Sequence, residues 1–248
     1  MKLIFSRFGG KKTKSREIIE EFGDHKIYVE AFLGSGAIFF EKESSSLSVL
    51  NDLDPAIYNI FEGAKNHSQS FDEQEWSWIP DREKWIQFKE NIISDLITDP
   101  TEKIYQSLYF IRHSWSGLGQ SFTPSRWKNN ETYMIQLGNY KEKLTNTIVS
   151  KRDYREVINE YDSEDTLFYL DPPYEVAVKK DYYEHKNGFN MIELRDTLKN
   201  IKGKFVLSLD ITDEITELFK DFNFKTLQFN YQTRKQNKDV KEYIIKNF

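Results

Sequence analysis

Seven short apolar runs, each long enough for one β-strand, recur along the 248 residues and restrict the folds open to this chain. Segments with helical spacing follow the first two runs, at 37–43 and 56–64. This alternation is typical of βαβ units, in which the strands lie parallel in one sheet. The seven runs are 27–30, 48–50, 147–149, 166–170, 205–209, 224–229 and 243–245. The sequence therefore predicts an α/β fold with a largely parallel sheet.

The long interval between the second and third runs does not continue this alternation. Apolar residues recur there at helical spacing, as at Ile104, Leu108 and Ile111. We therefore predict one α/β domain formed by 1–61 and 146–248. A mainly helical domain, 62–145, is inserted between its second and third strands.

The residue types that the sequence lacks exclude several kinds of chemistry. There is no cysteine, so disulfides, thiolate metal sites and a cysteine nucleophile are excluded together. The four histidines lie far apart without the spacing of a zinc helix, and we expect no metal site. No apolar run approaches the roughly 18 to 20 residues of a membrane span, and the start lacks a signal peptide's apolar stretch. We expect a cytoplasmic protein without membrane attachment.

Charge is distributed unevenly along the chain. The net charge of −5 argues against a general nucleic-acid coat protein. The first sixteen residues nevertheless hold six basic residues and no acid. This segment either forms a solvated tail or faces the phosphates of a ligand.

The first apolar run ends in a glycine loop that opens a helical segment. Gly34 and Gly36 lie in this loop, where backbone N–H groups and the positive end of a helix can hold an anion. Two glycines alone are equally compatible with an ordinary tight turn. The loop becomes informative only together with the acids that follow the next run.

Two acids follow the second run, the first of them about 18 residues beyond Gly34. An acid at this place hydrogen-bonds ribose hydroxyls in doubly wound folds. Asp54 precedes Pro55, a pattern typical of a helix N-cap followed by proline at the first helical position. Asp52 is therefore the better candidate for a ribose ligand.

The most specific motif is Asp171-Pro172-Pro173-Tyr174, directly after the apolar run 166–170. Two prolines fix the backbone and remove two N–H donors, which leaves the adjacent carbonyls free to accept hydrogen bonds. Asp171 adds a carboxylate acceptor, and Tyr174 adds an aromatic face. The motif therefore predicts a site for a planar base that carries an amino group, although an ordinary turn after a strand is the alternative.

These residues together resemble the Dam-type family of DNA adenine-N6 methyltransferases. The resemblance implies a Rossmann-like methyltransferase fold with a mixed, mostly parallel seven-stranded sheet. It also implies S-adenosylmethionine as cofactor, double-stranded DNA with a flipped adenine as substrate, and a cognate restriction enzyme as a possible partner. The inserted segment 62–145 corresponds to the family's target-recognition domain, which the stretch 112–122 partly resembles.

The resemblance also assigns roles to individual residues. It implies that Asp171, Pro172 and Tyr174 are catalytic. The residues that it implies for the cofactor are Phe8, Lys11, Glu30, Phe32, Gly34, Gly36, Asp52, Asp153, Tyr154 and Asp171. Tyr174, Tyr182 and Tyr183 are implied for the flipped base, and the candidates for DNA phosphates are Arg112, Arg126 and Lys128.

Several alternatives stay open at the level of the sequence. Methylation of cytosine C5 needs an attacking thiolate, which a chain without cysteine cannot supply. Cytosine N4, adenine in RNA and a protein glutamine are other planar amines, but their enzymes more often have serine or asparagine in place of Asp171. An inactive DNA-binding protein of the same fold is a further alternative, although DNA binding alone requires neither the glycines nor the acids.

Overall fold

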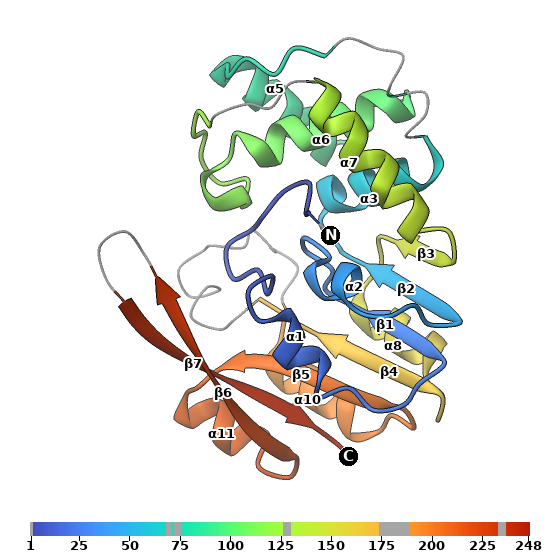
Figure 1. The fold of residues 1–248 in the computed structure, drawn as a ribbon, viewed down its shortest axis with the longest axis vertical. Coiled ribbons are helices and arrows are strands. Elements are labelled where there is room, and N and C mark those ends of the chain that lie inside the picture. Colours follow the sequence, from blue (N-terminus) through green and yellow to red (C-terminus); the bar gives the residue numbers. More distant parts are fainter. Residues whose placement is uncertain (1, 68–70, 72–75, 126–129, 174–188, 233–236) are drawn as a thin grey trace.

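A seven-stranded sheet forms the centre of the molecule, with the strand order β3-β2-β1-β4-β5-β7-β6 (Figure 1). The computed structural model describes residues 2–67, 71, 76–125, 130–173, 189–232 and 237–248. All seven predicted runs lie in strands, which confirms the α/β fold. The strands are β1 (Ile27–Glu30), β2 (Leu47–Asn51), β3 (Thr147–Ser150), β4 (Thr166–Leu170), β5 (Lys204–Asp210), β6 (Asn223–Gln232) and β7 (Asn237–Lys246).

One end of the sheet is antiparallel and the remainder is parallel. β1 pairs in parallel with β2 and β4, β2 with β3, and β4 with β5. β7 runs antiparallel to both β5 and β6. The sheet is thus mixed but mostly parallel, as expected. The strand order reverses between β1 and β4, and open α/β sheets bind ligands outside the carboxyl ends of their strands at such a point.

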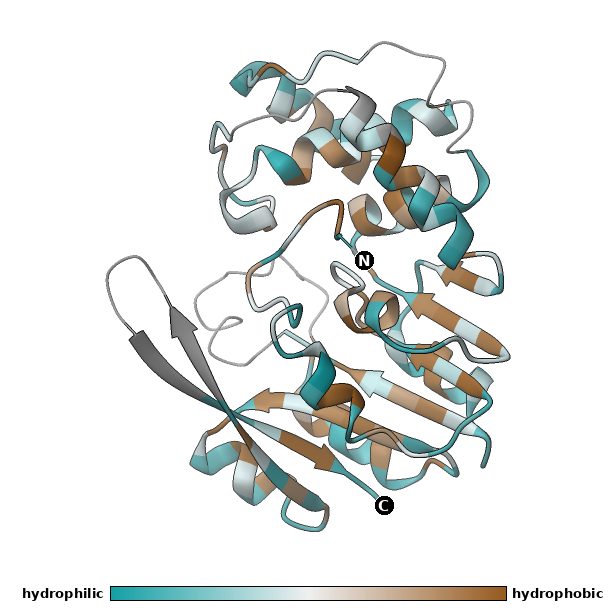
Figure 2. Cartoon of the chain, viewed as in Figure 1, coloured by the Kyte–Doolittle hydropathy of each residue, from teal (hydrophilic) through white to brown (hydrophobic). Residues whose placement is uncertain are grey.

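Both faces of the sheet are apolar, because successive side chains of a strand point to opposite sides. Tyr28 and Tyr169 belong to one buried cluster, whereas their neighbours Val29 and Phe168 belong to another. In Figure 2, brown residues are frequent along the central strands, and teal predominates on the outer loops. This pattern requires helices on both faces.

Helices cover both faces of the sheet. The first cluster includes residues of α1 (Ser15–Ile19), α2 (Ala37–Glu41) and α3 (Pro55–Asn66), and the second includes residues of α8 (Tyr154–Tyr161), α10 (Met191–Lys199) and α11 (Asp213–Leu218). The helices expected at 37–43 and 56–64 correspond to α2 and α3. None of the described helices is both long enough and apolar enough to cross a membrane.

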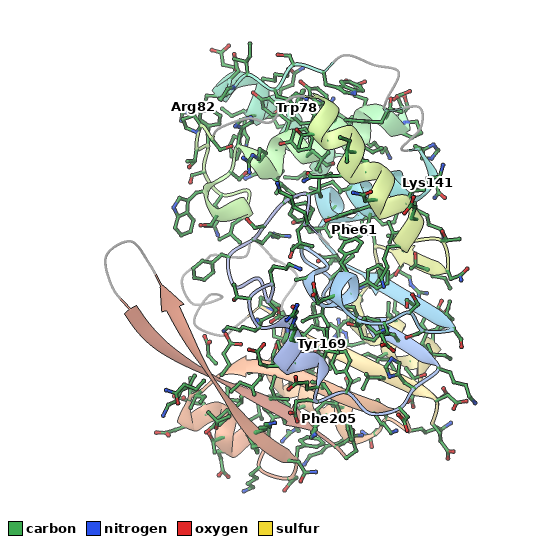
Figure 3. The ribbon with its side chains drawn as sticks, viewed as in Figure 1. Phe61, Trp78, Arg82, Lys141, Tyr169 and Phe205 are labelled. Carbon is green, nitrogen blue, oxygen red and sulfur yellow. The ribbon has the colours of Figure 1, made fainter. Side chains whose placement is uncertain are left out.

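A helical layer lies beyond one end of the sheet (Figure 1). We define it as α5 (Arg82–Ile93), α6 (Pro100–Arg112), the 3-10 helix η1 (Trp115–Gly117) and α7 (Asn130–Lys143), with the segment 76–81 that precedes α5. Its interior is aromatic: Trp78, labelled in Figure 3, stacks on Tyr133 with ring centroids 4.0 Å apart. α3 crosses the predicted boundary at 61/62 and packs against α6 and α7, so the layer shares a core with one face of the sheet.

Candidate active site at the carboxyl edge of the sheet

Two adjoining clefts lie at the carboxyl ends of the parallel strands, where the strand order reverses. The first, about 830 Å³ including its open mouth, lies between the N-terminal segment, the glycine loop and the end of β4. The second, about 510 Å³, lies between the end of β2 and the start of α8. They share Phe32, Asp52 and Pro173, so a single elongated ligand could occupy both.

The glycine loop between β1 and α2 forms one wall of the first cleft. Gly34 and Gly36 have φ values of 52° and 67°, in the left-handed region that side chains rarely adopt. A Cβ at Gly36 would lie 2.9 Å from the Phe61 ring, whereas a Cβ at Gly34 would meet no atom within 4 Å. Gly36 is therefore needed for packing, and Gly34 leaves open space beside the loop.

Asp52 connects this loop to the end of β2. Its Oδ2 accepts a hydrogen bond from the Gly34 N–H at 2.7 Å, and its Oδ1 accepts one from the Asp54 N–H at 3.0 Å. Burial raises the pKa of Asp52 above its ordinary value. A carboxylate has about four acceptor positions, so Asp52 can still accept hydrogen bonds from a ligand. Asp54 accepts from the Ala56 N–H and caps α3, as the sequence predicts.

Asp171 follows β4 and lies in the wall of the first cleft. Its Oδ1 accepts hydrogen bonds from Lys11 Nζ at 2.6 Å and from Ser208 Oγ at 3.2 Å. Burial raises the pKa of Asp171 above its ordinary value, and the positive charge of Lys11 opposes that increase. Pro172 and Pro173 continue the same wall without contributing an N–H donor. This wall therefore offers hydrogen-bond acceptors to a ligand.

Glu30 ends β1 and faces the same cleft. Its side chain is buried, with 2% of its surface exposed, and accepts a hydrogen bond from the Tyr28 hydroxyl at 2.9 Å. Burial raises the pKa of Glu30 to about 8, and the negative charge of Asp171 adds to the increase. Glu30 is therefore protonated at neutral pH unless a cation lies beside it.

The basic residues near the N-terminus are paired with acids. Lys11 and Lys14 are buried, although both are lysines. The pairs are Arg7–Asp54, Lys11–Asp171, Lys12–Glu41, Lys14–Glu242 and, at 4.0 Å, Arg16–Glu41. The segment is therefore not a solvated tail: its charges attach it to the sheet, to α2 and to the start of α3.

Phe8 connects the mouth of the first cleft with the helical layer. Half of its surface is exposed (50%), and its ring stacks on Trp115 of η1 with centroids 6.3 Å apart. The Phe8 N–H donates a hydrogen bond to the Ser116 carbonyl at 3.0 Å. Changes at the cleft mouth can thus reach the helical layer through direct contact.

Aromatic rings line the second cleft. The Tyr154 ring lies 5.3 Å from Phe32 and 5.9 Å from Phe189, measured between centroids. Among the described residues, the buried Tyr154 hydroxyl has no hydrogen-bond partner, and burial raises its pKa to about 12. Asp153 caps α8, and Arg155 binds both oxygens of its carboxylate at 2.8 Å. This cleft fits a flat, partly polar group.

The structure brings most of the predicted site residues together. The first cleft is lined by Phe8, Lys11, Glu30, Phe32, Gly34, Asp52, Asp171 and Pro172, and the second by Phe32, Asp52, Asp153 and Tyr154. Gly36 supports the loop from behind, and Arg112 lines a separate small pocket next to η1. Tyr174, Tyr182, Tyr183, Arg126 and Lys128 lie outside the described residues.

Two residues of this edge carry contacts that the sequence did not reveal. Ser208 donates a hydrogen bond to Asp171. The only hint of this in the sequence is that a serine interrupts the apolar residues of strand β5. The Asn51 amide makes four hydrogen bonds, to the Ala31 and Arg152 carbonyls, the Arg152 N–H and the Ser150 hydroxyl. Asn51 thereby joins the ends of three neighbouring strands, which no local pattern indicates.

The strand order, the glycine loop after β1 and the acid after β2 define a Rossmann-like methyltransferase that uses S-adenosylmethionine. The clefts fit that cofactor. Open space lies beside Gly34, Asp52 retains acceptor positions, and the second cleft offers aromatic walls with a buried hydroxyl that has no partner among the described residues.

Residues 8–233 match the D12 class N6 adenine-specific DNA methyltransferase family, and the chain belongs to this family. The enzyme is therefore an adenine-specific DNA methyltransferase. That range begins at Phe8 in the N-terminal segment, includes β1 to β6 and ends before β7.

The comparison with curated proteins gives distant relatives over nearly the full length. A Type II methyltransferase, M.MjaIII, of Methanocaldococcus jannaschii is 24% identical over 98% of each chain. Another, M1.LlaDCHI, of Lactococcus lactis subsp. cremoris is 24% identical over 98% of this chain and 95% of that one. A solved precorrin-6y C5,15-methyltransferase from Geobacter metallireducens GS-15 has a TM-score of 0.45 at 10% identity, covering 96% of this chain and 86% of that one.

Proposed function

We propose that this enzyme methylates an adenine flipped out of double-stranded DNA, and that Asp171 and the Pro172 carbonyl hold its N6 amine. The observation that carries the proposal is the acceptor wall at the end of β4, where Lys11 and Ser208 bind Asp171. Pro172 and Pro173 lie beside that carboxylate in the same cleft. An amine with two N–H groups is the ligand that such a pair of acceptors suits.

The two clefts divide the cofactor between them in this proposal. Phe8, Lys11, Glu30, Phe32, Gly34 and Gly36 form or support the methionine end of the site. Asp52 accepts hydrogen bonds from the ribose hydroxyls, and Asp153 and Tyr154 contact the adenine of the cofactor. S-adenosylmethionine supplies the methyl group, which its sulfonium activates for transfer. Asp52 lines both clefts, which supports placing the ribose between them.

The acceptor wall makes the target amine a better nucleophile. The lone pair of an adenine amine is delocalised into the ring, so the amine is a poor nucleophile in solution. Hydrogen bonds from its two N–H groups to Asp171 and the Pro172 carbonyl favour tetrahedral geometry and free the lone pair. The Asp171 carboxylate also stabilises the positive charge that develops on the nitrogen during transfer. The bond from sulfur to the methyl group would break as the bond to N6 forms, S-adenosylhomocysteine would leave, and the methylated nitrogen would release one proton to water. Catalysis is then mainly positioning, without a covalent enzyme intermediate.

Base flipping brings the amine to this wall. Extruding a base costs a few kcal/mol, and stacking on an aromatic side chain recovers roughly 1 to 3 kcal/mol. We assign that stacking to Tyr174 on the basis of the family resemblance, which also implies Tyr182 and Tyr183 for the flipped base.

We assign target recognition to the inserted segment 62–145, which contains the helical layer. Arg112, Arg126 and Lys128 are the candidates for phosphate contacts. The two relatives named as Type II methyltransferases support a partnership with a restriction enzyme of the same specificity. Methylation-aware sequencing of DNA from cells that express the enzyme would identify the methylated base and its sequence context.

The direct test is substitution of Asp171. Asp171→Ala and the isosteric Asp171→Asn should lower the single-turnover rate of methyl transfer about a thousandfold, because one preorganised electrostatic contact contributes about 10² to 10³ in rate. Binding of S-adenosylmethionine, measured by calorimetry, should be largely kept. Asp165→Ala is the matched control, since Asp165 is an exposed acid just before β4 that pairs with Lys26. Substantial turnover in Asp171→Asn would refute the proposed role.

A further inference from the structure

A buried chain of hydroxyl groups lies behind the acceptor wall. Ser208 of β5 is 0% exposed, and Tyr169 of β4 is 1% exposed. In the parallel register, Leu170 lies opposite Leu207, so Asp171 lies next to Ser208. Figure 3 labels Tyr169 next to α1, and Tyr169 and Ile18 of α1 belong to the same buried cluster. Both hydroxyls are thus held by the sheet and are shielded from water.

The hydrogen bonds of this chain have one consistent direction. Ser208 Oγ lies 3.2 Å from Asp171 Oδ1 and 3.2 Å from the Tyr169 hydroxyl. The serine has one proton, which it donates to the carboxylate. The Tyr169 hydroxyl therefore donates to Ser208. Each donor polarises the next, and the chain ends on the group that we propose to bind the target amine.

The charged and titratable groups around Asp171 are Lys11 and Lys14 of the N-terminal segment, Glu30 of β1, Asp210 of β5 and Glu242 of β7. The chain acts on the same oxygen as Lys11. Two donors on Oδ1, one from the N-terminal segment and one from β5, fix the plane of the Asp171 carboxyl group. Hydrogen bonds to the charged form also favour ionisation, where burial disfavours it. Bonds to a charged acceptor are roughly twice as strong as those between neutral groups.

We propose that Ser208, supported by Tyr169, is a positioning residue that orients Asp171 and keeps it ionised for methyl transfer. This inference rests on the proposed role of Asp171 as the acceptor for the target amine. Tyr169 lines the first cleft, but its hydroxyl acts through Ser208, and Ser208, which lines neither cleft, acts through Asp171.

The test is the pH dependence of the single-turnover rate, which excludes product release. Ser208→Ala should move the acid limb of that profile upward by about one pH unit, because the carboxylate loses a donor that favours its charged form. At a pH on that limb, the rate should fall about tenfold. Tyr169→Phe should shift the limb in the same direction by less. The affinity for S-adenosylmethionine should stay unchanged in Ser208→Ala, because Ser208 lines neither cleft.

Two further variants separate positioning from packing. In the double variant Tyr169→Phe/Ser208→Ala, the shift should equal that of Ser208→Ala alone, because Tyr169 acts only through the serine. Ser208→Thr keeps the hydroxyl and should restore the acid limb. Matched controls are Ser107→Ala and Tyr140→Phe, which remove buried hydroxyls bonded to Asn59 and to the Ile4 N–H. These controls should leave the limb in place.

The outcomes distinguish this inference from the proposed function. If Asp171→Asn abolishes transfer and Ser208→Ala leaves the acid limb where the unchanged enzyme has it, the positioning role of Ser208 is wrong and the role of Asp171 stands. Additive shifts of Ser208→Ala and Tyr169→Phe would also overturn the chain. If Asp171→Asn retains turnover, the proposed function itself fails, whatever happens at Ser208.

Discussion

The carboxyl edge of the sheet and the helical layer both contain buried side chains, but these side chains are of different kinds. At the edge, the buried side chains include four ionisable groups, namely Lys11, Lys14, Glu30 and Glu242. In the helical layer they include eight aromatic rings, namely Trp78, Trp85, Phe88, Tyr105, Tyr109, Phe110, Tyr133 and Tyr140. One region is held by ion pairs and hydrogen bonds, and the other by ring contacts.

This difference separates function from stability. Removing a charge from water costs several kcal/mol unless a partner and hydrogen bonds compensate, so buried charges are weak contributors to stability. In the function proposed above, the groups at the edge fix acceptors for a cationic cofactor and an amine. Rings stabilise by burial and packing, and their contribution hardly depends on pH. Substitutions in the two regions should therefore differ in kind.

The largest effect on folding should come from the aromatic layer. Trp78→Ala removes a buried ring that stacks on Tyr133, and the unfolding free energy should fall by about 3 to 5 kcal/mol. The loss should be the same from about pH 7 to about pH 8.5, because His113, which contacts the Trp78 carbonyl and whose pKa burial lowers, is neutral there. Denaturant titration measures both quantities. Ile93→Ala, at an exposed position of α5, is the control and should change little.

The second largest loss of stability should come from breaking the buried ion pair Lys14–Glu242 at the carboxyl edge. Lys14→Met leaves the Glu242 carboxylate buried without its cation, and the unfolding free energy should fall by about 3 kcal/mol. The double variant Lys14→Met/Glu242→Leu removes both charges and should recover most of that loss. Lys12→Met breaks an exposed pair with Glu41 and should cost less than about 1 kcal/mol. If the double variant stayed as unstable as Lys14→Met, the pair itself would be a net source of stability.

The same contrast explains how far the sequence alone predicts this molecule. Strand positions, the cap at Asp54 and the acceptor motif after β4 are local patterns, because each depends on residues a few positions apart. The partners of Lys14 and Asp171 are not local: Glu242 lies 228 residues beyond Lys14. Such pairs depend on the strand order, and β5 and β7 become neighbours only in the folded sheet. The family resemblance nominated Lys11 for the cofactor, yet it gave no sign that Lys11 binds Asp171.

Two glycines in one loop offer a sharper comparison within the edge. Gly36→Ala places a methyl group 2.9 Å from the Phe61 ring at a φ of 67°, and should lower the unfolding free energy by about 2 to 3 kcal/mol. Gly34→Ala has open space and should cost only about 1 to 2 kcal/mol for its backbone conformation. Its methyl group lies beside the first cleft, so Gly34→Ala should weaken cofactor binding more than its effect on stability suggests. Denaturation measures the loss of stability and calorimetry the loss of cofactor affinity in each variant. If the two losses at Gly34 were equal, the expected contact between this position and the cofactor would be wrong.

The smallest effect concerns Glu30, and it appears as a dependence on pH. The Glu30 pKa is raised from 4.5 to about 8 by burial, so the folded protein without ligand retains a proton that the unfolded chain releases. The contribution of Glu30 to stability is thus fully present below about pH 4.5 and is lost as the pH rises through about 8. A cationic cofactor beside Glu30 reverses this preference, because its positive charge favours the carboxylate. Binding should therefore release a proton.

As the pH rises from about 6 to about 7, the dissociation constant of the cofactor should fall by at most about tenfold. Calorimetry in buffers of different ionisation enthalpy measures both the affinity and the proton released. Glu30→Gln has no proton to release, so its affinity should be weaker at about pH 8 and nearly independent of pH. Release of a full proton by Glu30→Gln would place the titrating group elsewhere, with Asp171 the nearest alternative. The pH dependence of cofactor binding would then come from Asp171, at the proposed site of the target amine, and not from Glu30 at the cofactor site.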